Sequence, residues 1–206
     1  DSLARASELT GMSSMIKIDQ SIQRYLAQRA LGSGIQNVLF TDIRTVEDAE
    51  DCVRAVRAET PEAGGLYPNT RRRHTRYVQD NGSPEFVEAM NDAIVALMIE
   101  KESAMNDLKN ILAVDGVDMV QFGPGDYAMS IGKTGQTDDP EVVEAEKRMI
   151  EMALDMDVAP RAEINTPEEA QEYIDMGVKH FNINVDALIV HSWLKDNGSE
   201  LRSMLE

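Results

Sequence analysis

Two acidic residues near the middle of the chain follow apolar segments that are expected to be buried strands. Glu100 ends the apolar run 96–100, and Asp126 follows a second run, 119–122, through Gly-Pro-Gly. The segment 103–112 between them is predicted to be a helix. Functional groups of parallel α/β proteins gather at the carboxyl ends of the strands. The two carboxylates are therefore expected to lie together and to hold one hard divalent cation, unless they serve as a helix cap and a surface ion pair.

The glycine-rich turn before Asp126 adds a second kind of group. Gly123 and Gly125 flank Pro124 and are predicted to leave backbone amides accessible beside the carboxylates. Such amides bind anions, as they do at other glycine-rich turns. Gly123, Pro124 and Gly125 are therefore predicted to bind the carboxylate of a substrate.

Composition limits the protein classes that fit. The 206 residues are 42% hydrophobic and 28% charged, which predicts one globular domain over residues 1–206. A formal net charge of −17 argues against binding to nucleic acids or anionic membranes, because both need a positive face. No long apolar run or leader segment is present, so a cytoplasmic location is predicted.

The single cysteine excludes an internal disulfide. Cys52 shares a helical spacing with Ala49, Val53 and Val56 and is predicted to be a small core residue, not a nucleophile.

Strands alternate with capped helices along the whole chain, which is typical of βα units with a parallel sheet. Six strands are predicted, beginning at Met15, Asn37, Ala96, Met119, Ala159 and Phe181. Helix starts are predicted at Thr45, Ser83, Asp139 and Thr166, the last with a full capping box to Glu169. An early helix, 22–31, is predicted to be closed by Gly32 and Gly34.

The predicted fold is a (β/α)8 TIM barrel. Such a barrel has eight strands and about 250 residues, so about two βα units, roughly 45 to 50 residues, are expected to precede the given chain. An open six-stranded sheet is the alternative.

Residues 15 to about 188 resemble the HpcH/HpaI aldolase family of the phosphoenolpyruvate/pyruvate barrel superfamily. The resemblance rests on IEKESAMNDLKNIL, VDGVDMVQFGPGDYAMSIG, the DPEVVEAE helix start and the late NVD, in order. It implies a homo-oligomer, trimer or hexamer, with Glu100 and Asp126 as the protein ligands of Mg²⁺, Mn²⁺ or Co²⁺. It also implies a class II aldolase that reversibly cleaves a 4-hydroxy-2-oxo acid to pyruvate, or a related 2-oxo acid, and an aldehyde through a metal-stabilised enolate.

Two positions depart from the family pattern. Lys17 stands where the family usually has an arginine, and Met98 where it often has a glutamine; the family's histidine base is expected in the part that precedes this chain. Lys17 is predicted to be a catalytic and substrate-binding cation. It could instead be a Schiff-base nucleophile, if burial lowers its pKa, or a strand-end partner of Asp19 or Asp42.

A basic segment within the polar stretch 61–82 leaves other functions open. It consists of Arg71, Arg72, Arg73, His74 and Arg76. These residues could contact the phosphates of an acyl-CoA in a lyase of the same superfamily, a neighbouring acidic surface, or only solvent. A catalytically silent relative that binds an oxo acid is the alternative outside the enzymes.

Overall fold

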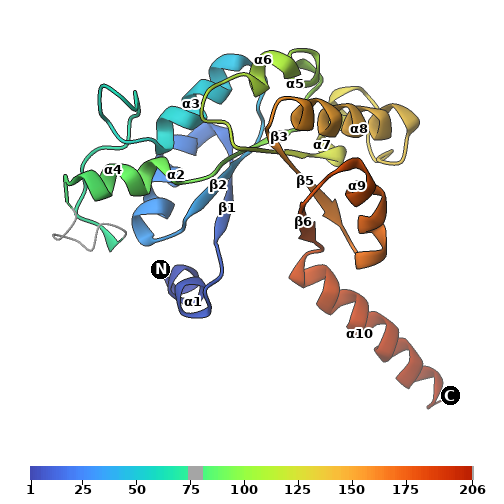
Figure 1. The fold of residues 1–206 in the computed structure, drawn as a ribbon. Helices are drawn as coiled ribbons and strands as arrows, with labels where there is room; N and C mark the ends of the chain where they lie inside the picture. Colours follow the sequence, from blue (N-terminus) through green and yellow to red (C-terminus); the bar gives the residue numbers. More distant parts are fainter. Residues whose placement is uncertain (74–80, 206) are drawn as a thin grey trace. The chain divides into compact units, whose positions relative to one another are not determined.

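The computed structural model describes residues 1–73 and 81–205, and over these residues it contains six strands (Figure 1). The strands follow one another in the sheet in chain order: β1 (Met15–Ile18), β2 (Asn37–Phe40), β3 (Val95–Ile99), β4 (Met119–Phe122), β5 (Ala159–Ile164) and β6 (His180–Ile183). The pairs β1–β2, β2–β3, β3–β4 and β5–β6 are parallel. The predicted series of parallel βα units is therefore confirmed.

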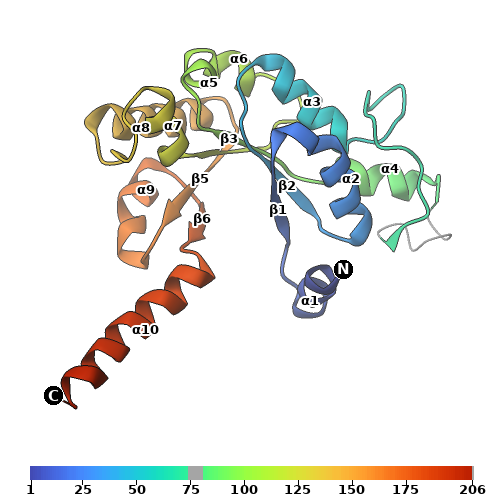
Figure 2. The same ribbon diagram turned by 180° about the vertical axis from the view of Figure 1, so that it is seen from behind.

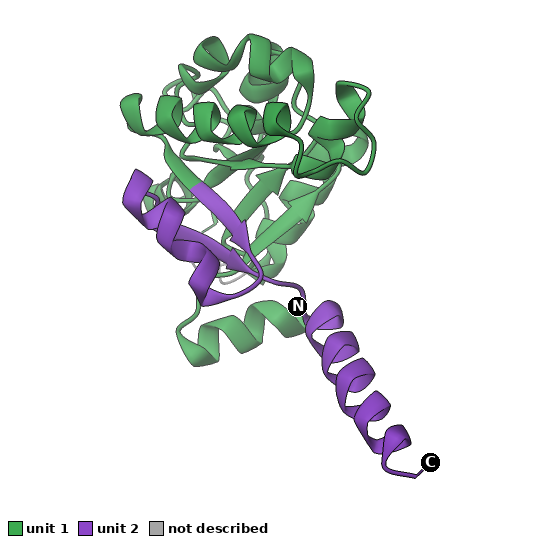
Figure 3. Cartoon of the chain, turned by 90° about the vertical axis from the view of Figure 1, so that its right-hand side faces the viewer, with its two compact units in different colours: residues 1–160 green, residues 161–206 purple. Residues whose placement is uncertain are grey.

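The chain divides into two compact units, residues 1–160 and 161–206 (Figure 3). Unit 1 holds β1 to β4 and the start of β5, where the Ala159 N–H donates to the Asp118 carbonyl at 3.1 Å. Unit 2 holds the rest of β5 and β6. That residues 1–206 form one domain stays a prediction.

The helices of unit 1 lie between and beside its strands. They are α1 (Ser2–Thr10), α2 (Gln23–Ser33), α3 (Val46–Val56), α4 (Pro84–Asn91), α5 (Glu102–Asn106), α6 (Leu108–Leu112), α7 (Pro124–Ser130) and α8 (Pro140–Asp155), with a 3₁₀ turn η1 (Gln20–Ile22). Helices α2, α3, α6 and α8 contact one another in that order along one face of the unit 1 sheet (Figures 1 and 2). The loops that follow the strands lie at the carboxyl ends of the sheet.

Unit 2 contains a 3₁₀ turn η3 (Pro167–Glu169) and two helices, α9 (Ala170–Met176) and α10 (Asp186–Ser203). None of the residues of α10, all of which the structure describes, is buried. The helix exposes a series of large apolar side chains, Leu188, Ile189, Val190, Trp193, Leu194 and Leu201. Along the described part of the chain, no helix has the length and apolar character needed to cross a membrane.

The core of unit 1 forms around β2 and β3, in which every residue is buried. Continuous apolar sequence is what a central parallel strand covered on both faces requires. The register sets Lys17 beside Leu39, and Leu39 beside Ala96. Partners in a parallel register point to the same face, and Leu39, Ala96 and Met98 form one buried cluster there.

Side-chain caps explain where several helices begin. Thr45 and Asp48 form a complete capping box at the start of α3, and Ser83 and Asp139 cap α4 and α8 as predicted. The capping box predicted at Thr166 is wrong. The Glu169 carboxylate accepts the N–H of Asn165 at 2.8 Å, instead of the N–H of Thr166 that a capping box requires.

Two helix boundaries also differ from the prediction. Gly32 is inside α2, which ends at Ser33, and the left-handed Gly34 alone is the cap. The predicted helix 103–112 is two short helices, because Asp107 leaves the helical region with φ −112° and ψ 21°.

A buried arginine ties together loops at the amino-terminal edge of the unit 1 sheet. The Arg57 guanidinium donates to the carbonyls of Met90, Ala93 and Gly116 and to the Asp118 carboxylate, at 2.6 to 3.3 Å. The Asp118 carboxylate also accepts the N–H of Val95, the first residue of β3, at 2.8 Å. One side chain thus fixes the segments that lead into β3 and β4, the two strands that carry Glu100 and Asp126.

Candidate metal and substrate site

Glu100 follows directly after β3 and is 4% exposed. Its Oε1 accepts the backbone N–H of Asp42 at 2.7 Å. Burial raises the pKa of the Glu100 carboxyl, and the negative charges of Asp126 and Asp42 add to this effect. The hydrogen bond from the Asp42 N–H and the charge of Lys101 act in the opposite direction. Glu100 is therefore a buried acid whose ionised form needs a further positive charge nearby.

Asp42 stands at the carboxyl end of the neighbouring strand β2 in a conformation unusual for a residue with a side chain. Its φ is +59°, in the left-handed region that Asp tolerates better than most residues. Its N–H donates to Glu100, and its carboxylate Oδ1 lies 3.0 Å from the Lys101 Nζ. Local strain of this kind is often found at functional sites.

Lys101 connects three consecutive strand ends. Its Nζ lies 3.0 Å from Asp42 Oδ1 and 3.1 Å from Asp126 Oδ1, and the Lys101 side chain is only 12% exposed. Burial alone would lower the pKa of Lys101, but the hydrogen bonds to Asp42 and Asp126 outweigh it and raise that pKa. The ammonium therefore stays charged between the two carboxylates. The predicted gathering of Glu100 and Asp126 at one sheet edge is present in the structure.

Gly123 leaves the space that the Glu100 side chain occupies. A Cβ at position 123 would lie 2.7 Å from both the Cβ and the Oε2 of Glu100, and 3.4 Å from Met98 Cγ. The N–H of Gly123 donates to the Ile99 carbonyl at 3.1 Å. The absence of a side chain at Gly123 therefore admits Glu100, while substrate binding by this residue stays a prediction.

The next residues begin helix α7. Pro124 has no N–H and occupies the first helical position, where none is needed. The amides of Gly125 and Asp126 fall in the first turn, where backbone N–H groups have no acceptor within their own helix. Nothing in the structure crowds Gly125: an added Cβ would meet no atom within 4 Å.

A comparison with known families decides the group to which this arrangement belongs. The model of the HpcH/HpaI aldolase/citrate lyase family matches residues 2–189. The chain belongs to this family. The predicted resemblance is confirmed, and the family is one of carbon–carbon lyases.

Individual relatives agree with this assignment. A 4-hydroxy-2-oxo-heptane-1,7-dioate aldolase from Escherichia coli is 29% identical over 164 residues, which are 79% of this chain and 61% of the relative. The crystal structure of an HpcH/HpaI aldolase from Desulfitobacterium hafniense DCB-2 aligns with a TM-score of 0.85 at 22% identity, over 97% of this chain and 76% of that one. The citrate synthase SbnG aligns with a TM-score of 0.84 at 20% identity, over 98% and 77%. The two structures establish the fold.

The donor set of this HpcH/HpaI chain fits a hard divalent cation. Glu100 and Asp126 offer carboxylate oxygens, the ligands that hard divalent cations prefer. Burial and the negative charge of Asp126 both disfavour the ionised form of Glu100. A divalent cation would offset both effects. Among residues 1–73 and 81–205, no cluster of three or more His, Cys, Asp or Glu side chains forms a metal site. The remaining positions around the cation would therefore belong to water and substrate.

Replacing Gly123 by alanine tests the steric role of this glycine. Because the new methyl would lie 2.7 Å from the Glu100 Cβ and Oε2, Glu100 and β4 have to move apart. We expect Gly123→Ala to lower the free energy of unfolding by about 1–3 kcal/mol, as overpacking of buried sites does. Urea denaturation measures this loss. Gly125→Ala is the matched control, and an equal loss in both variants would contradict the steric role.

Lys17 lies on the same face of the sheet as Glu100 but farther from the strand ends. It is exposed, so the burial on which a Schiff-base role depends is absent. Its register partner is Leu39, whose own partner Ala96 precedes Glu100 by four residues, or about 13 Å along a strand. Asp42, one of its predicted partners, pairs with Lys101 and Arg44 instead.

A glutamine lies on the strand next to Met98. Gln121 is the register partner of Met98 and is 1% exposed. A buried amide therefore lies beside Met98, two residues before Gly123. Gln121 was not among the predicted site residues, although a single polar residue in an otherwise apolar strand is a signal for it.

The other candidate residues lie away from the two carboxylates. Cys52 is fully buried, and burial strongly raises the pKa of its thiol, which confirms its place in the core. Arg72 donates to the Gln28 carbonyl of α2 at 2.8 Å, and Arg73 pairs with Glu8 of α1. Of the basic segment, His74 and Arg76 lie outside the described residues.

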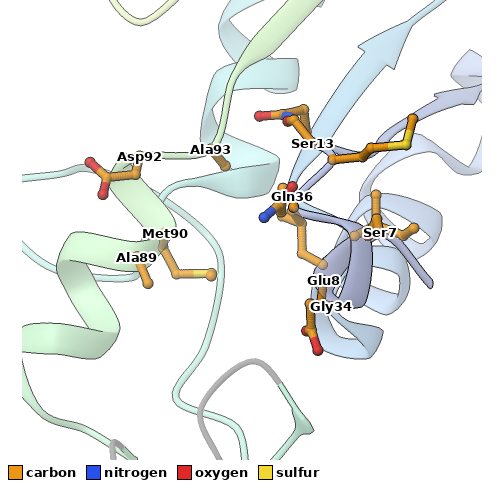
Figure 4. A pocket seen from close by; sticks show the side chains of 14 residues that line it. Ser7, Glu8, Ser13, Gly34, Gln36, Ala89, Met90, Asp92 and Ala93 are labelled. Carbon is orange, nitrogen blue, oxygen red and sulfur yellow. The ribbon is translucent and has the colours of Figure 1, made fainter. Parts of the chain in front are cut away.

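A cavity of about 730 Å³ opens at the other edge of the unit 1 sheet. Figure 4 shows Met90, Asp92 and Ala93 on one side of it and Glu8 and Gln36 on the other. These residues lie before β1, β2 and β3, whereas Glu100 and Asp126 follow β3 and β4. This cavity therefore lies at the amino-terminal ends of the strands, whereas the functional groups of parallel α/β proteins gather at the carboxyl ends.

Asp42 and Lys101 are the functional candidates that the sequence analysis did not assign to this site. Asp42 follows β2 as Glu100 follows β3, so the rule of strand carboxyl ends already pointed to it. Lys101 follows Glu100 directly, but its direction toward Asp126 depends on the packing of α7 against the strand ends and has no signal in the sequence.

Proposed function

We propose that this chain forms the catalytic part of a divalent-metal-dependent aldolase that reversibly cleaves a 4-hydroxy-2-oxo acid. The products are pyruvate, or a related 2-oxo acid, and an aldehyde. The observation that carries the proposal is the buried Glu100 beside Asp126 at the ends of consecutive parallel strands, in a family of carbon–carbon lyases. The chain spans 61% of the length of the Escherichia coli aldolase to which it is similar, and that relative's name gives the substrate class.

Glu100 and Asp126 are proposed as the protein ligands of the cation, which we take to be Mg²⁺, Mn²⁺ or Co²⁺. A divalent metal is what the resemblance to this family implies, and the two carboxylates support it. The bound cation supplies Lewis acidity to the reaction. Glu100 is held in place by the Asp42 N–H, whereas the Asp126 side chain is 57% exposed and open to solvent and substrate.

The substrate is proposed to bind through its charged groups. Its carboxylate lies against the first turn of α7, where the N–H groups of Gly125 and Asp126 have no acceptor within their own helix, with Pro124 at the first helical position. Lys17 faces the same side of the sheet and is proposed as a substrate-binding cation rather than a nucleophile. No general base is assigned to a residue of this chain.

The proposal extends to the fold of the complete protein and to its assembly. We propose a (β/α)8 barrel of which the six parallel strands in chain order are six units. The solved relatives, aligned at TM-scores of 0.84 and 0.85, support it. We also propose a homo-oligomer, trimer or hexamer; the apolar side chains that α10 exposes, Trp193 among them, are suited to a subunit contact.

Exchange of the pyruvate methyl protons for deuterium tests the proposal without knowledge of the aldehyde. The complete protein is incubated with pyruvate in D₂O, with Mg²⁺, Mn²⁺ or Co²⁺ or with EDTA, and the mass of pyruvate is measured. We expect exchange with at least one of the metals and none with EDTA. A folded protein that gives no exchange with any of the three would contradict the pyruvate chemistry and favour a silent binder.

No observation favours the acyl-CoA alternative. Arg72 and Arg73 of the basic segment contact α2 and α1, the helices that lead into β2 and β1. Glu100 and Asp126 follow the opposite ends of the strands.

A further inference from the structure

The ammonium of Lys101 lies where a cation bound to Asp126 would compete with it. Its Nζ is 3.1 Å from Asp126 Oδ1, an oxygen of the proposed metal ligand, and 3.0 Å from Asp42 Oδ1. The Lys101 side chain is 12% exposed, so its position is set by packing as well as by charge. It therefore differs from a surface lysine, whose ion pairs contribute little to the stability of the protein.

The net charge of the three carboxylates and this ammonium would balance that of one divalent cation. Glu100, Asp126 and Asp42 bring three negative charges when ionised, and Lys101 brings one positive charge, so the group carries −2. Without Lys101 the group would carry −3 and attract a cation more strongly. Lys101 thus lowers the attraction of the site for a metal while it limits the repulsion among the carboxylates.

We propose that Lys101 is a tethered competitor of the metal, which holds Asp126 in the metal-free protein and moves fully onto Asp42 when a divalent cation binds. The inference rests on the proposed metal site. Asp42 suits the second position, because its carboxylate already contacts the ammonium and its backbone is fixed by the hydrogen bond to Glu100. Lys101 is then a positioning residue that sets metal affinity, so that the cation binds reversibly rather than permanently.

The alternative role is simple support. If Lys101 only orients Asp126 for the metal, its removal leaves a loosely held ligand and weakens metal binding. The two roles therefore predict opposite signs for the same substitution, and an affinity measurement separates them without any assay of activity.

Mn²⁺ titration of the metal-free protein, followed by the electron paramagnetic resonance signal of free Mn²⁺, makes the measurement. We expect Lys101→Met to tighten Mn²⁺ binding about tenfold, the effect of removing a unit charge from the vicinity of a divalent ion near the protein surface. Lys133→Met is the matched control, since Lys133 also bridges two carboxylates, Asp139 at 2.5 Å and Glu141 at 2.8 Å. It should leave the affinity unchanged.

A second pair of variants tests the movement onto Asp42. Asp42→Asn weakens Mn²⁺ binding through lost charge in any background, but with Lys101 present it also removes the place to which the ammonium moves. We therefore expect Asp42→Asn to weaken binding several-fold more in the wild type than in the Lys101→Met background. Equal effects would overturn the movement.

The outcomes for this inference and for the proposed function are distinct. Unchanged or weaker Mn²⁺ binding in a folded Lys101→Met variant, with a wild type that binds Mn²⁺, would overturn the competitor role alone. Absence of Mn²⁺ binding in both proteins would overturn the metal site and with it this role. Binding by Lys101→Met but not by the wild type would support competition in its strongest form.

Discussion

Replacing Glu100 by glutamine is expected to lower metal-dependent proton exchange of pyruvate by about 10³-fold, equivalent to about 4 kcal/mol of barrier. The amide keeps the shape of the side chain and an oxygen for the Asp42 N–H, but it removes the buried negative charge that would hold the cation. Asp126→Asn is expected to act in the same way through the second ligand. Mass measurement of pyruvate after incubation in D₂O with saturating Mg²⁺ gives the rate.

Glu102→Gln is the matched control for this experiment. Glu102 is an exposed carboxylate two residues farther along, at the start of α5. It removes the same charge from the same part of the chain, so it should keep nearly the full rate. Near wild-type exchange in a folded Glu100→Gln variant would contradict a ligand role for Glu100.

Glu100→Gln should also stabilise the metal-free protein. Because burial, Asp126 and Asp42 raise the pKa of Glu100 in the folded state, folding disfavours its ionised form. The contribution of Glu100 to stability is therefore fully present below the pKa of the unfolded chain and decreases as pH rises toward the raised folded value. At neutral pH we expect Glu100→Gln to unfold at a higher urea concentration than the metal-free wild type.

Removal of the Arg57 guanidinium is expected to cause the largest loss of stability. Arg57→Met leaves the carbonyls of Met90, Ala93 and Gly116 without this donor in a site where the arginine side chain is only 10% exposed. Asp118 loses less, because it keeps the N–H of Val95 and is 37% exposed. We expect a decrease of about 3 kcal/mol in the free energy of unfolding.

Thermal and urea unfolding followed by circular dichroism measure this decrease. Arg54→Met is the matched control. Arg54 lies one turn earlier, in α3, and forms an exposed pair with Asp51 at 3.6 Å, so its substitution should cost less than about 1 kcal/mol. Similar losses in the two variants would show that Arg57 contributes its charge to the surface rather than hydrogen bonds to the buried carbonyls.

Much of the fold follows from short-range patterns in the sequence. Strands β1, β2, β4 and β5 begin at the predicted residues, and β3 and β6 begin one residue earlier than predicted. Apolar segments between polar or glycine-containing turns are a local signal, which is why the error is so small. The starts of α4 and α8 were predictable because an N-cap followed by proline acts within one turn. The capping box predicted at Thr166 is absent because the Glu169 carboxylate accepts the backbone N–H of Asn165, which is just as near in the sequence.

The site was predictable only in part. Alternation of strands and helices was enough to place Glu100 and Asp126 together, since parallel strands end at the same edge. The left-handed backbone of Asp42 and the direction of Lys101 depend on contacts across 58 and 25 residues of sequence, respectively. The cytoplasmic location and the single domain stay predictions.

The division of the chain at Pro160 has a consequence for local unfolding. Asp42, Glu100, Lys101 and Asp126 all belong to unit 1. A ligand stabilises only those states in which its site is intact. Partial openings confined to unit 2 therefore keep the site, and metal binding should slow amide hydrogen exchange in β2, β3 and β4 while leaving the openings of α10 at their metal-free frequency.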